Sequence, residues 1–440
     1  MEAPVNHSRS SRTADRPRVV VTGMGATTPL GGSVAQTWGA IRSGESGVTK
    51  LETDGPPLPV RLAGLLREDP TVPLARCLYP EPHEQARMAR RLPALLDRSQ
   101  QVALLAAHEA LTDADLLTSS LPSRVTEVDP ERLAVALGSG VGGANSLIQA
   151  HDTLHERGWT RVPPWAVTRL MPGGPAAAVS IEFGAQAGVH APSSACASGA
   201  EALWLGRMLI QTGRADVVIA GGADASISPV SIAGFAVIRS LSRCDDPERA
   251  ARPFDRDRDG FVMGEGAGVL VLERQEHAQA RGAKIHAHLV GAEVSADAND
   301  WKLPDTERQV RTLQAAIADA ELTPYDIDHV SAHATGTLAG DAAEARAISR
   351  ALGPACPTVT AIKGHTSHMI GAAGAVEAIV AIRTIQTGVV PAVRNLEQLD
   401  ADIEDLDVVR SAHREQRGIR AALSSSFGFG GVNAVLVLTA

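Results

Sequence analysis

Short apolar runs that end at glycine recur along this chain and alternate with stretches of helical spacing. The runs at 18–21, 133–137, 217–220 and 269–272 predict buried strands. Between them, residues 100–111 and 197–212 place apolar side chains three to four positions apart, which predicts helices, and Gly213 stands where a helix C-cap is expected. This alternation is typical of an α/β fold whose sheets are covered by helices.

The pattern restarts near residue 285. Further strands are predicted at 285–290, 329–332, 421–425 and 434–438, and further helices at 308–320, 342–352 and 371–387. We therefore expect two stacked α/β halves, at 17–284 and 285–440. The polar, Arg/Ser-rich residues 1–16 ahead of them are expected to form a disordered tail.

Charge and cysteine usage exclude several classes of protein. The net charge of −9 argues against nucleic-acid binding, which needs a basic face. The four cysteines are scattered and lack the paired spacing of a zinc site or a disulfide framework: Cys77, Cys196, Cys244 and Cys356. The chain has no run of eighteen apolar residues and no apolar segment near its start, so we expect no membrane span and a reducing, cytoplasmic location.

Cys196 lies between an apolar segment and the start of a predicted helix, within the sequence SSACASGA. The positive end of the helix dipole favours a thiolate at such a position. The small neighbours leave room for a substrate to approach the sulfur. A buried structural cysteine is the alternative, because free cysteine is among the most buried residue types.

Two histidine motifs and one glycine-rich turn follow in the second half. His333 begins HATGT at the end of a predicted strand, where α/β folds place catalytic groups. Lys363 and His368 belong to KGHTSH, at the entrance of a predicted helix. The turn SFGFGG at 426–431 joins two predicted strands and could aim a backbone N–H at an oxyanion. Each histidine alone is more often an ordinary polar residue than a catalyst, so the combination carries the argument.

Two other motifs suggest functions that the rest of the chain does not support. GSGVGG at 138–143 fits the dinucleotide pattern G-x-G-x-x-G, but the acidic residue expected about 20 positions later is absent. Asp255-Arg256-Asp257-Arg258-Asp259-Gly260 resembles the start of a calcium loop, but the twelfth position is Gly266, not Glu. We interpret the second segment as a charged structural loop.

Taken together, the motifs resemble those of the β-ketoacyl-acyl-carrier-protein synthases, in the elongating (synthase II-like) Cys-His-His branch of the thiolase-like superfamily. The resemblance runs from about residue 17 to the C-terminus and rests on VVVTGMGATTPLG, GSGVGG, SSACASGA, PFDRDRDGFVMGEGAGVLVLE, HATGT, the Lys363/His368 pair and SFGFGGVN. It implies an α/β, thiolase-like fold in which the two halves form five layers, α-β-α-β-α. Two departures stand out, Ala334 and Ser367, at positions where glycine is usual, and His365 is an additional histidine.

The resemblance also implies a role for individual residues. Cys196 corresponds to the nucleophile, and His333 and His368 to the pair that assists decarboxylation and stabilises the enolate. Lys363 and Glu377 correspond to an ion pair that organises the site. Phe429 corresponds to the residue whose N–H completes the oxyanion hole with that of Cys196, and to a gating phenylalanine. The implied substrate contacts are Thr335 and Thr337 for the pantetheine arm, and Val141 and Phe235 for the acyl chain.

The implied reaction is a decarboxylative Claisen condensation with malonyl-acyl-carrier protein, which needs no metal or organic cofactor. The implied partners are an acidic acyl carrier protein and a second subunit, identical or related, with the strand near Val217 pairing across a two-fold axis. Arginines that could meet the carrier protein are Arg87, Arg90, Arg91 and Arg239. Two pathways stay open, fatty-acid elongation and a type II polyketide or polyene synthase with a chain-length-factor-like partner. A non-catalytic partner subunit would lack at least one of Cys196, His333 and His368, and all three are present. A degradative thiolase would carry a second cysteine in the terminal glycine turn.

Overall fold

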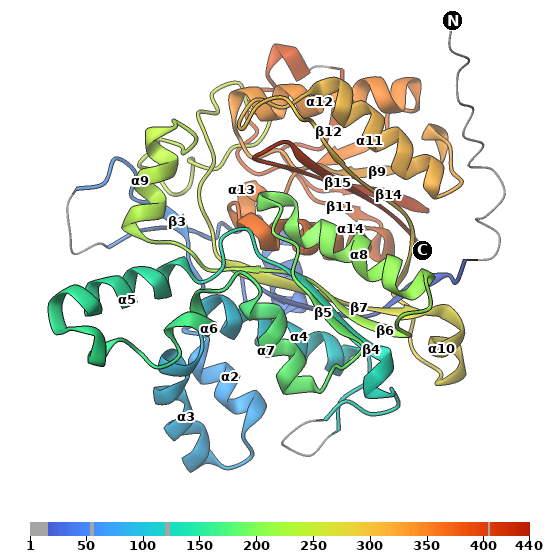
Figure 1. Ribbon diagram of the computed structural model, residues 1–440. Coiled ribbons are helices and arrows are strands. Elements are labelled where there is room, and N and C mark those ends of the chain that lie inside the picture. The colour runs from blue at the N-terminus through green and yellow to red at the C-terminus, as the bar shows by residue number, and fades with distance from the viewer. Residues whose placement is uncertain (1–15, 53–56, 119–123, 404) are drawn as a thin grey trace, which may run out of the picture.

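The computed structural model describes residues 16–52, 57–118, 124–403 and 405–440, so the predicted tail at 1–16 lies outside the described residues except for Arg16. Within them, helices and strands are stacked in five layers, α-β-α-β-α, as the resemblance implies (Figure 1). One continuous sheet of eleven strands supplies both β layers, in the order β12-β10-β9-β14-β15-β8-β1-β7-β6-β4-β5.

The first half of the sheet is built by the strands β1 (Val19–Thr27), β4 (Leu133–Gly138), β5 (Gly188–His190), β6 (Val217–Asp224) and β7 (Gly266–Arg274). The three strands β5, β4 and β6 run parallel, and β7 and β1 are antiparallel to their neighbours. On the outer face lie α4 (Arg98–Asp113) and α7 (Gly174–Phe183). β4, β6 and most of β7 are buried along their length, which explains why they read as unbroken apolar runs.

The second half repeats this arrangement with β8 (Ala287–Ala296), β9 (His329–Ser331), β10 (Thr358–Thr360), β14 (Ala421–Gly428) and β15 (Val432–Thr439), plus the edge strand β12 (Asp407–Val408). Its outer helices are α11 (Thr306–Asp319) and α12 (Leu338–Leu352). If the five strands of each half are numbered 1 to 5 along the chain, leaving out β12, both halves have the same order in the sheet. From the outer edge of the sheet to the junction between the halves, this order is 3-2-4-5-1.

The two halves of the sheet meet at β1 and β8. Only two residue pairs connect these strands, Val20 with His288 and Val21 with Ala287. The common strand order indicates a duplicated topology that residue identities alone did not reveal. A division of the chain between residues 284 and 285, in the segment from α10 (Gln275–Ala280) to β8, stays our proposal.

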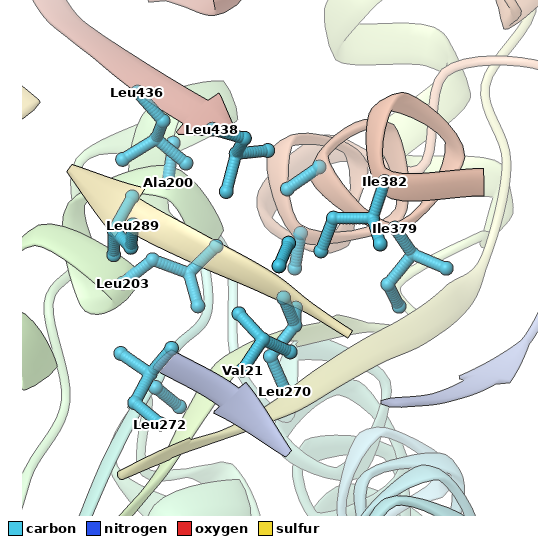
Figure 2. Packing of buried hydrophobic residues seen from close by; sticks show 14 of the residues in the cluster. Val21, Ala200, Leu203, Leu270, Leu272, Leu289, Ile379, Ile382, Leu436 and Leu438 are labelled. Atoms are coloured by element: carbon cyan, nitrogen blue, oxygen red, sulfur yellow. The ribbon is translucent and has the colours of Figure 1, made fainter. Parts of the chain in front are cut away.

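The middle layer consists of α8 (Ser198–Gln211) and α14 (Ala373–Thr387), which contact strands of both halves. Figure 2 shows side chains of these helices packing with those of β1, β7, β8 and β15 in one apolar cluster. Nearly every residue of α14 is buried, so this helix is apolar on all sides. The segment 370–387 is long and apolar enough to span a membrane, but 78% of it is buried inside the protein, as expected of a core helix.

The other elements surround this core. The remaining helices are α1 (Val34–Arg42), α2 (Thr71–Leu78), α3 (Pro82–Leu95), α5 (Ala144–Arg157), α6 (Ala166–Leu170), α9 (Pro229–Val237) and α13 (Lys363–Thr366). Two small sheets pair β2 (Val48–Lys50) with β3 (Leu62–Gly64), and β11 (Val389–Val390) with β13 (Arg414–Glu415). The predicted strands and helices are all present, with ends that differ by several residues. The differences are largest for β1 and β8, which continue to Thr27 and Ala296 beyond the predicted ends at 21 and 290.

One expectation about assembly is wrong. β6, which begins at Val217, is hydrogen-bonded to β4 on one side and to β7 on the other. A strand with both edges occupied cannot pair with a second subunit. The edge strands of the described sheet are β5 and β12.

Candidate active site

Cys196 lies in a 3-10 turn, Ala195–Ala197, that leads directly into α8. Ala195 has a positive φ of 51°, a conformation that costs a non-glycine residue energy and that turns the cysteine toward the base of a cavity. Cys196 is half-buried there. The predicted position at a helix start is therefore correct.

The structure brings Cys196 together with both predicted histidines. The Nε2 atom of His368 lies 3.0 Å from the sulfur of Cys196. The rings of His333 and His368 are 5.3 Å apart and nearly perpendicular. The sulfur and one nitrogen of each ring all lie within 4.8 Å of one another, so a single small group can contact all three.

His333 is held by the Lys363 and Glu377 pair. Lys363 and Glu377 form a fully buried ion pair. The Lys363 ammonium also donates to the carbonyl oxygen of His333 at 2.5 Å and to its Nδ1 atom at 3.2 Å. An ammonium group can only donate, so Nδ1 is the acceptor and the neutral ring carries its proton on Nε2. His333 therefore presents an N–H donor on the side away from Lys363.

Burial controls the charge state of the site. It lowers the pKa of His333 and of His368 well below the usual range, and the positive charge of Lys363 adds to the effect. Burial raises the pKa of Cys196 to about 11, while Lys363 and the Phe429 N–H act in the opposite direction. Burial therefore opposes the thiolate that the helix start favours, and at a pKa of about 11 the thiol of Cys196 carries its proton beside a neutral histidine.

The predicted glycine-rich turn connects β14 and β15 and lies across Cys196. A Cβ atom on Gly428 would approach the Ser194 carbonyl oxygen to 2.8 Å and the Cys196 nitrogen to 3.3 Å, so a glycine allows this close approach. The backbone N–H of Phe429 faces the sulfur of Cys196. Two backbone N–H groups, those of Cys196 and Phe429, are thus available beside the sulfur of Cys196.

A cavity of about 410 Å³ opens onto these groups. Its lining includes the predicted substrate contacts Val141, Phe235, Thr335 and Thr337, as well as Phe429. The hydroxyl oxygens of Thr335 and Thr337 lie 3.0 Å apart, and the ring of Phe235 lies 6.3 Å from that of Phe429. Lys363 and Glu377 are buried behind His333 and do not line the cavity.

The four arginines proposed for carrier docking are not in one place. Arg239 lines the cavity. Arg87, Arg90 and Arg91 lie on α3, which packs on α2 at a distance from α13 and α14 (Figure 1). Within a single chain, only Arg239 is at the cavity.

Buried carboxylates that the sequence reasoning missed hold the histidine loop. Glu344, on α12, accepts the backbone N–H groups of His333 and Ala334 at 2.8 and 2.7 Å and the hydroxyl of Ser425 at 2.7 Å. Asp341 accepts the N–H of Gly336 at 3.0 Å. Burial raises the pKa of Glu344 to about 7 and that of Asp341 to about 6, and the hydrogen bonds oppose it. Both acids stand on the apolar face of their helix, the one signal that could have identified them.

The glycine loop at 138–143 and the acidic segment at 255–260, which suggested a dinucleotide site and a calcium site, form hydrogen bonds within the protein. The loop after β4 directs the N–H groups of Gly140 and Val141 to the carboxylate of Asp224, at 2.8 and 3.2 Å. An internal carboxylate thus occupies the amides that would bind a pyrophosphate. The oxygens of Asp255 accept hydrogen bonds from Arg252 and from the backbone of Glu397 and are committed to the structure.

The departure at Ser367 and the additional His365 both fit the structure around them. Ser367 adopts φ 60° and ψ −178°, a conformation suited to glycine. Its hydroxyl fills space left by two glycines: a Cβ atom on Gly64 or Gly264 would lie 1.8 or 2.2 Å from Ser367 Oγ. The ring nitrogens of the buried His365 each lie 3.0 Å from a backbone carbonyl oxygen, those of Glu45 and Ala392.

The Cys196, His333 and His368 cluster has a donor set suited to a borderline-soft cation such as Zn²⁺. A neutral histidine that binds a metal through Nε2 must carry its proton on Nδ1. The Lys363 ammonium donates to Nδ1 of His333 and adds a positive charge, so the local electrostatics oppose a metal ion.

Comparison with known proteins places this chain in a wider group. The β-ketoacyl synthase N-terminal domain matches residues 16–278, and the C-terminal domain matches residues 286–397. The chain is 42% identical to the 3-oxoacyl-[acyl-carrier-protein] synthase 2 of Mycobacterium bovis over 96% of both chains. A type II polyketide ketosynthase solved with its acyl-carrier protein is similar at 29% identity and a TM-score of 0.84, over 97% of this chain and 100% of that chain. The ishigamide ketosynthase/chain length factor is similar at 30% identity and a TM-score of 0.85, over 96% of this chain and 99% of that chain.

Proposed function

The chain belongs to the β-ketoacyl synthase family, and on this premise we propose that it joins an acyl group held on Cys196 to malonyl-acyl-carrier protein, as an elongating 3-oxoacyl-[acyl-carrier-protein] synthase. The observation that carries the proposal is the convergence of Cys196, His368 and His333 at the base of one cavity, with His368 Nε2 3.0 Å from the sulfur. The pathway is fatty-acid elongation in the cytoplasm.

In the first half-reaction, the sulfur of Cys196 attacks the thioester carbonyl of the acyl carrier protein. His368, neutral and 3.0 Å away, takes the thiol proton as the new carbon–sulfur bond forms. The N–H groups of Cys196 and Phe429 stabilise the oxyanion, and such donors contribute roughly 3 kcal/mol each. The bond to the pantetheine sulfur then breaks, and that sulfur leaves with the proton.

In the second half-reaction, the malonyl carboxylate leaves as carbon dioxide, and its bonding electrons move into an enolate. Lys363 holds the proton of His333 on Nε2, so this ring can donate to the enolate oxygen. His368 supplies the second donor once its ring proton has exchanged from Nδ1 to Nε2, because the first half-reaction leaves Nε2 unprotonated. The enolate carbon attacks the Cys196 thioester, the carbon–sulfur bond breaks, and the β-ketoacyl group stays on the carrier. The Cys196 sulfur leaves as a thiolate and takes up one proton from solvent, which restores the thiol. No step calls for a metal or an organic cofactor.

Thr335 and Thr337 are assigned to the pantetheine arm, and Val141 and Phe235 to the acyl chain, because all four line the cavity. A second candidate function has support of its own. The structural similarity to a type II polyketide ketosynthase and to the ishigamide ketosynthase/chain length factor favours a ketosynthase subunit that acts with a chain-length-factor-like partner.

In either case we propose a dimer formed through the edge strand β5. This strand ends the described sheet, and Val189 on it and Ile181 on the adjacent α7 are 46% and 80% exposed. Exposed apolar side chains beside an unpaired strand favour pairing with a second copy or a related subunit.

The test is a condensation assay with radiolabelled malonyl carrier protein and a series of acyl carrier proteins, run beside a Cys196→Ala variant. We expect β-ketoacyl product and an acylated Cys196 from the wild type and neither from the variant. Activity only with a related partner subunit would favour the polyketide function. Failure of Cys196 to become acylated with or without a partner would refute the proposal.

A further inference from the structure

A fully buried carboxylate, that of Asp224, joins three segments close to the active site. Asp224 is the last residue of β6 and does not belong to the cavity lining. Its oxygens accept four hydrogen bonds, from the Ser139 hydroxyl at 2.7 Å and from the backbone N–H groups of Gly140, Val141 and Gly371 at 2.8, 3.2 and 2.7 Å. The end of β6, the loop after β4 and the entrance of α14 thus meet at one side chain.

Hydrogen bonds alone compensate the charge of this carboxylate. Within the described residues Asp224 forms no ion pair, and four donors fill the positions at which a carboxylate accepts hydrogen bonds. Burial raises the pKa of Asp224, and the hydrogen bonds act in the opposite direction. An amide in the same place has a single accepting oxygen, so at least two of the donors would lose their partner.

Two strained turns belong to or contact the segments that this carboxylate joins. Ala195, directly before Cys196, has a φ of 51°. Ile370, two positions after His368, has a φ of 49°. Such values are unfavourable for residues other than glycine, and most of all for a β-branched residue, so the surrounding structure must hold them. Gly140 packs against both turns: a Cβ atom there would lie 2.9 Å from the Ala195 carbonyl oxygen and 2.8 Å from Ile370 Cγ2.

Gly140 therefore lies between the turn that carries the cysteine and the turn that follows the histidine. Asp224 accepts the N–H of Gly140 and also that of Gly371, the residue after Ile370. A Cβ atom on Gly371 would lie 2.5 Å from Asp224 Oδ2 and 2.6 Å from the Gly140 nitrogen, so these three residues are in close contact. The relative position of the two turns thus depends on the carboxylate between them.

We propose that Asp224 is a positioning residue that holds Cys196 and His368 at reacting distance. Its hydrogen bonds to Gly140 and Gly371 fix the two turns against each other and so maintain the 3.0 Å between the sulfur and His368 Nε2. The inference rests on the proposed function, in which His368 takes the thiol proton across this contact. Displacing reacting groups by about 1 Å can lower a rate about a hundredfold.

The experiment measures acylation of Cys196 by mass spectrometry in Asp224→Asn, with and without the additional substitution His368→Ala. We expect Asp224→Asn alone to lower the kcat of acylation about a hundredfold and to change the KM less than about twofold, because Asp224 lies outside the cavity lining. In the His368→Ala background the same substitution should lower the rate less than about twofold, since a residue that acts through the contact with His368 has little effect once that contact is absent.

Asp97→Asn is the matched control. Asp97 is also a buried carboxylate that accepts a backbone N–H and a serine hydroxyl, but it is outside the cavity lining, so the acylation rate should not change. If Asp224→Asn fails to fold, Ser139→Ala removes one of the four donors and keeps the carboxylate, and it should lower the rate about fivefold, again only while His368 is present. Acylation of Asp224→Asn at the wild-type rate, or equal losses with and without His368, would overturn the proposal.

Crystal structures of the wild type and of the same variants separate this inference from the proposed function. If the wild type fails to acylate Cys196 with any acyl donor, the proposed function fails. The distance between the sulfur and His368 Nε2 still decides the positioning role. We expect it to increase by about 1 Å in Asp224→Asn, and an unchanged distance would contradict the role of Asp224.

Discussion

Replacing Lys363 and Glu377 should separate the stability that their ion pair provides from the catalytic role that we propose for Lys363. The two side chains are only 2% and 1% exposed, and the second oxygen of Glu377 has no hydrogen-bond partner among the described residues. Removing one partner leaves a buried charge without compensation. We therefore expect Lys363→Met and Glu377→Met each to lower the free energy of unfolding by about 3 to 5 kcal/mol.

The double variant Lys363→Met/Glu377→Met places two apolar side chains of similar volume in the same space. Its stability should return to within about 1 kcal/mol of the wild type, since buried ion pairs and apolar replacements are often nearly equivalent. Its condensation rate should stay at least about a hundredfold low, because nothing then donates to Nδ1 of His333 and fixes the proton on Nε2.

Urea unfolding followed by circular dichroism, together with the condensation assay on the same preparations, measures both effects. Single variants that lose less than about 1 kcal/mol would show that water reaches the pair. Recovery of activity in the double variant would show that Lys363 acts only as a counter-ion of Glu377, and the tautomer argument would then be wrong.

Three further outcomes are expected. Glu344→Gln should lower the free energy of unfolding, measured with urea, by about 2 kcal/mol. The reason is that an amide N–H₂ replaces an oxygen that accepts hydrogen bonds. The pKa of Glu344 is about 7 in the folded protein and 4.5 ordinarily. Its contribution to the free energy of unfolding is therefore fully present below pH 4.5 and lost as the pH rises through 7, and this pH dependence should be absent in the variant. Gly64→Ala should strongly lower the melting temperature, because the added Cβ atom would lie 1.8 Å from Ser367 Oγ. Adding Ser367→Gly should recover most of this loss, and strictly additive effects of the two substitutions would contradict the prediction. Iodoacetamide should alkylate Cys196 about ten times faster for each pH unit between 8 and 10, since its pKa is about 11, and a plateau below pH 9 would contradict this.

The local features of this site are encoded within short segments of sequence. A cysteine before a helix, a histidine after a strand and a glycine-rich turn between strands each depend on a few neighbouring residues. Cys196, His333 and the turn at 426–431 could therefore be placed on their elements without a structure. The alternation of apolar runs and helical stretches likewise predicted the α/β architecture, because burial on both faces forces strands to be apolar throughout.

Contacts between distant residues could not be read from such patterns. Cys196 and His368 are 172 positions apart, and their 3.0 Å contact depends on how α8 and α14 pack between the two halves of the sheet. Two other long-range contacts could not be predicted for the same reason. Asp224 accepts hydrogen bonds from backbone N–H groups of the glycine loop at 138–143, and Glu344 accepts the backbone N–H of His333. The pKa of Cys196 depends on the same packing. Desolvation by every group around the sulfur raises it to about 11, and no short segment of sequence shows which groups those are.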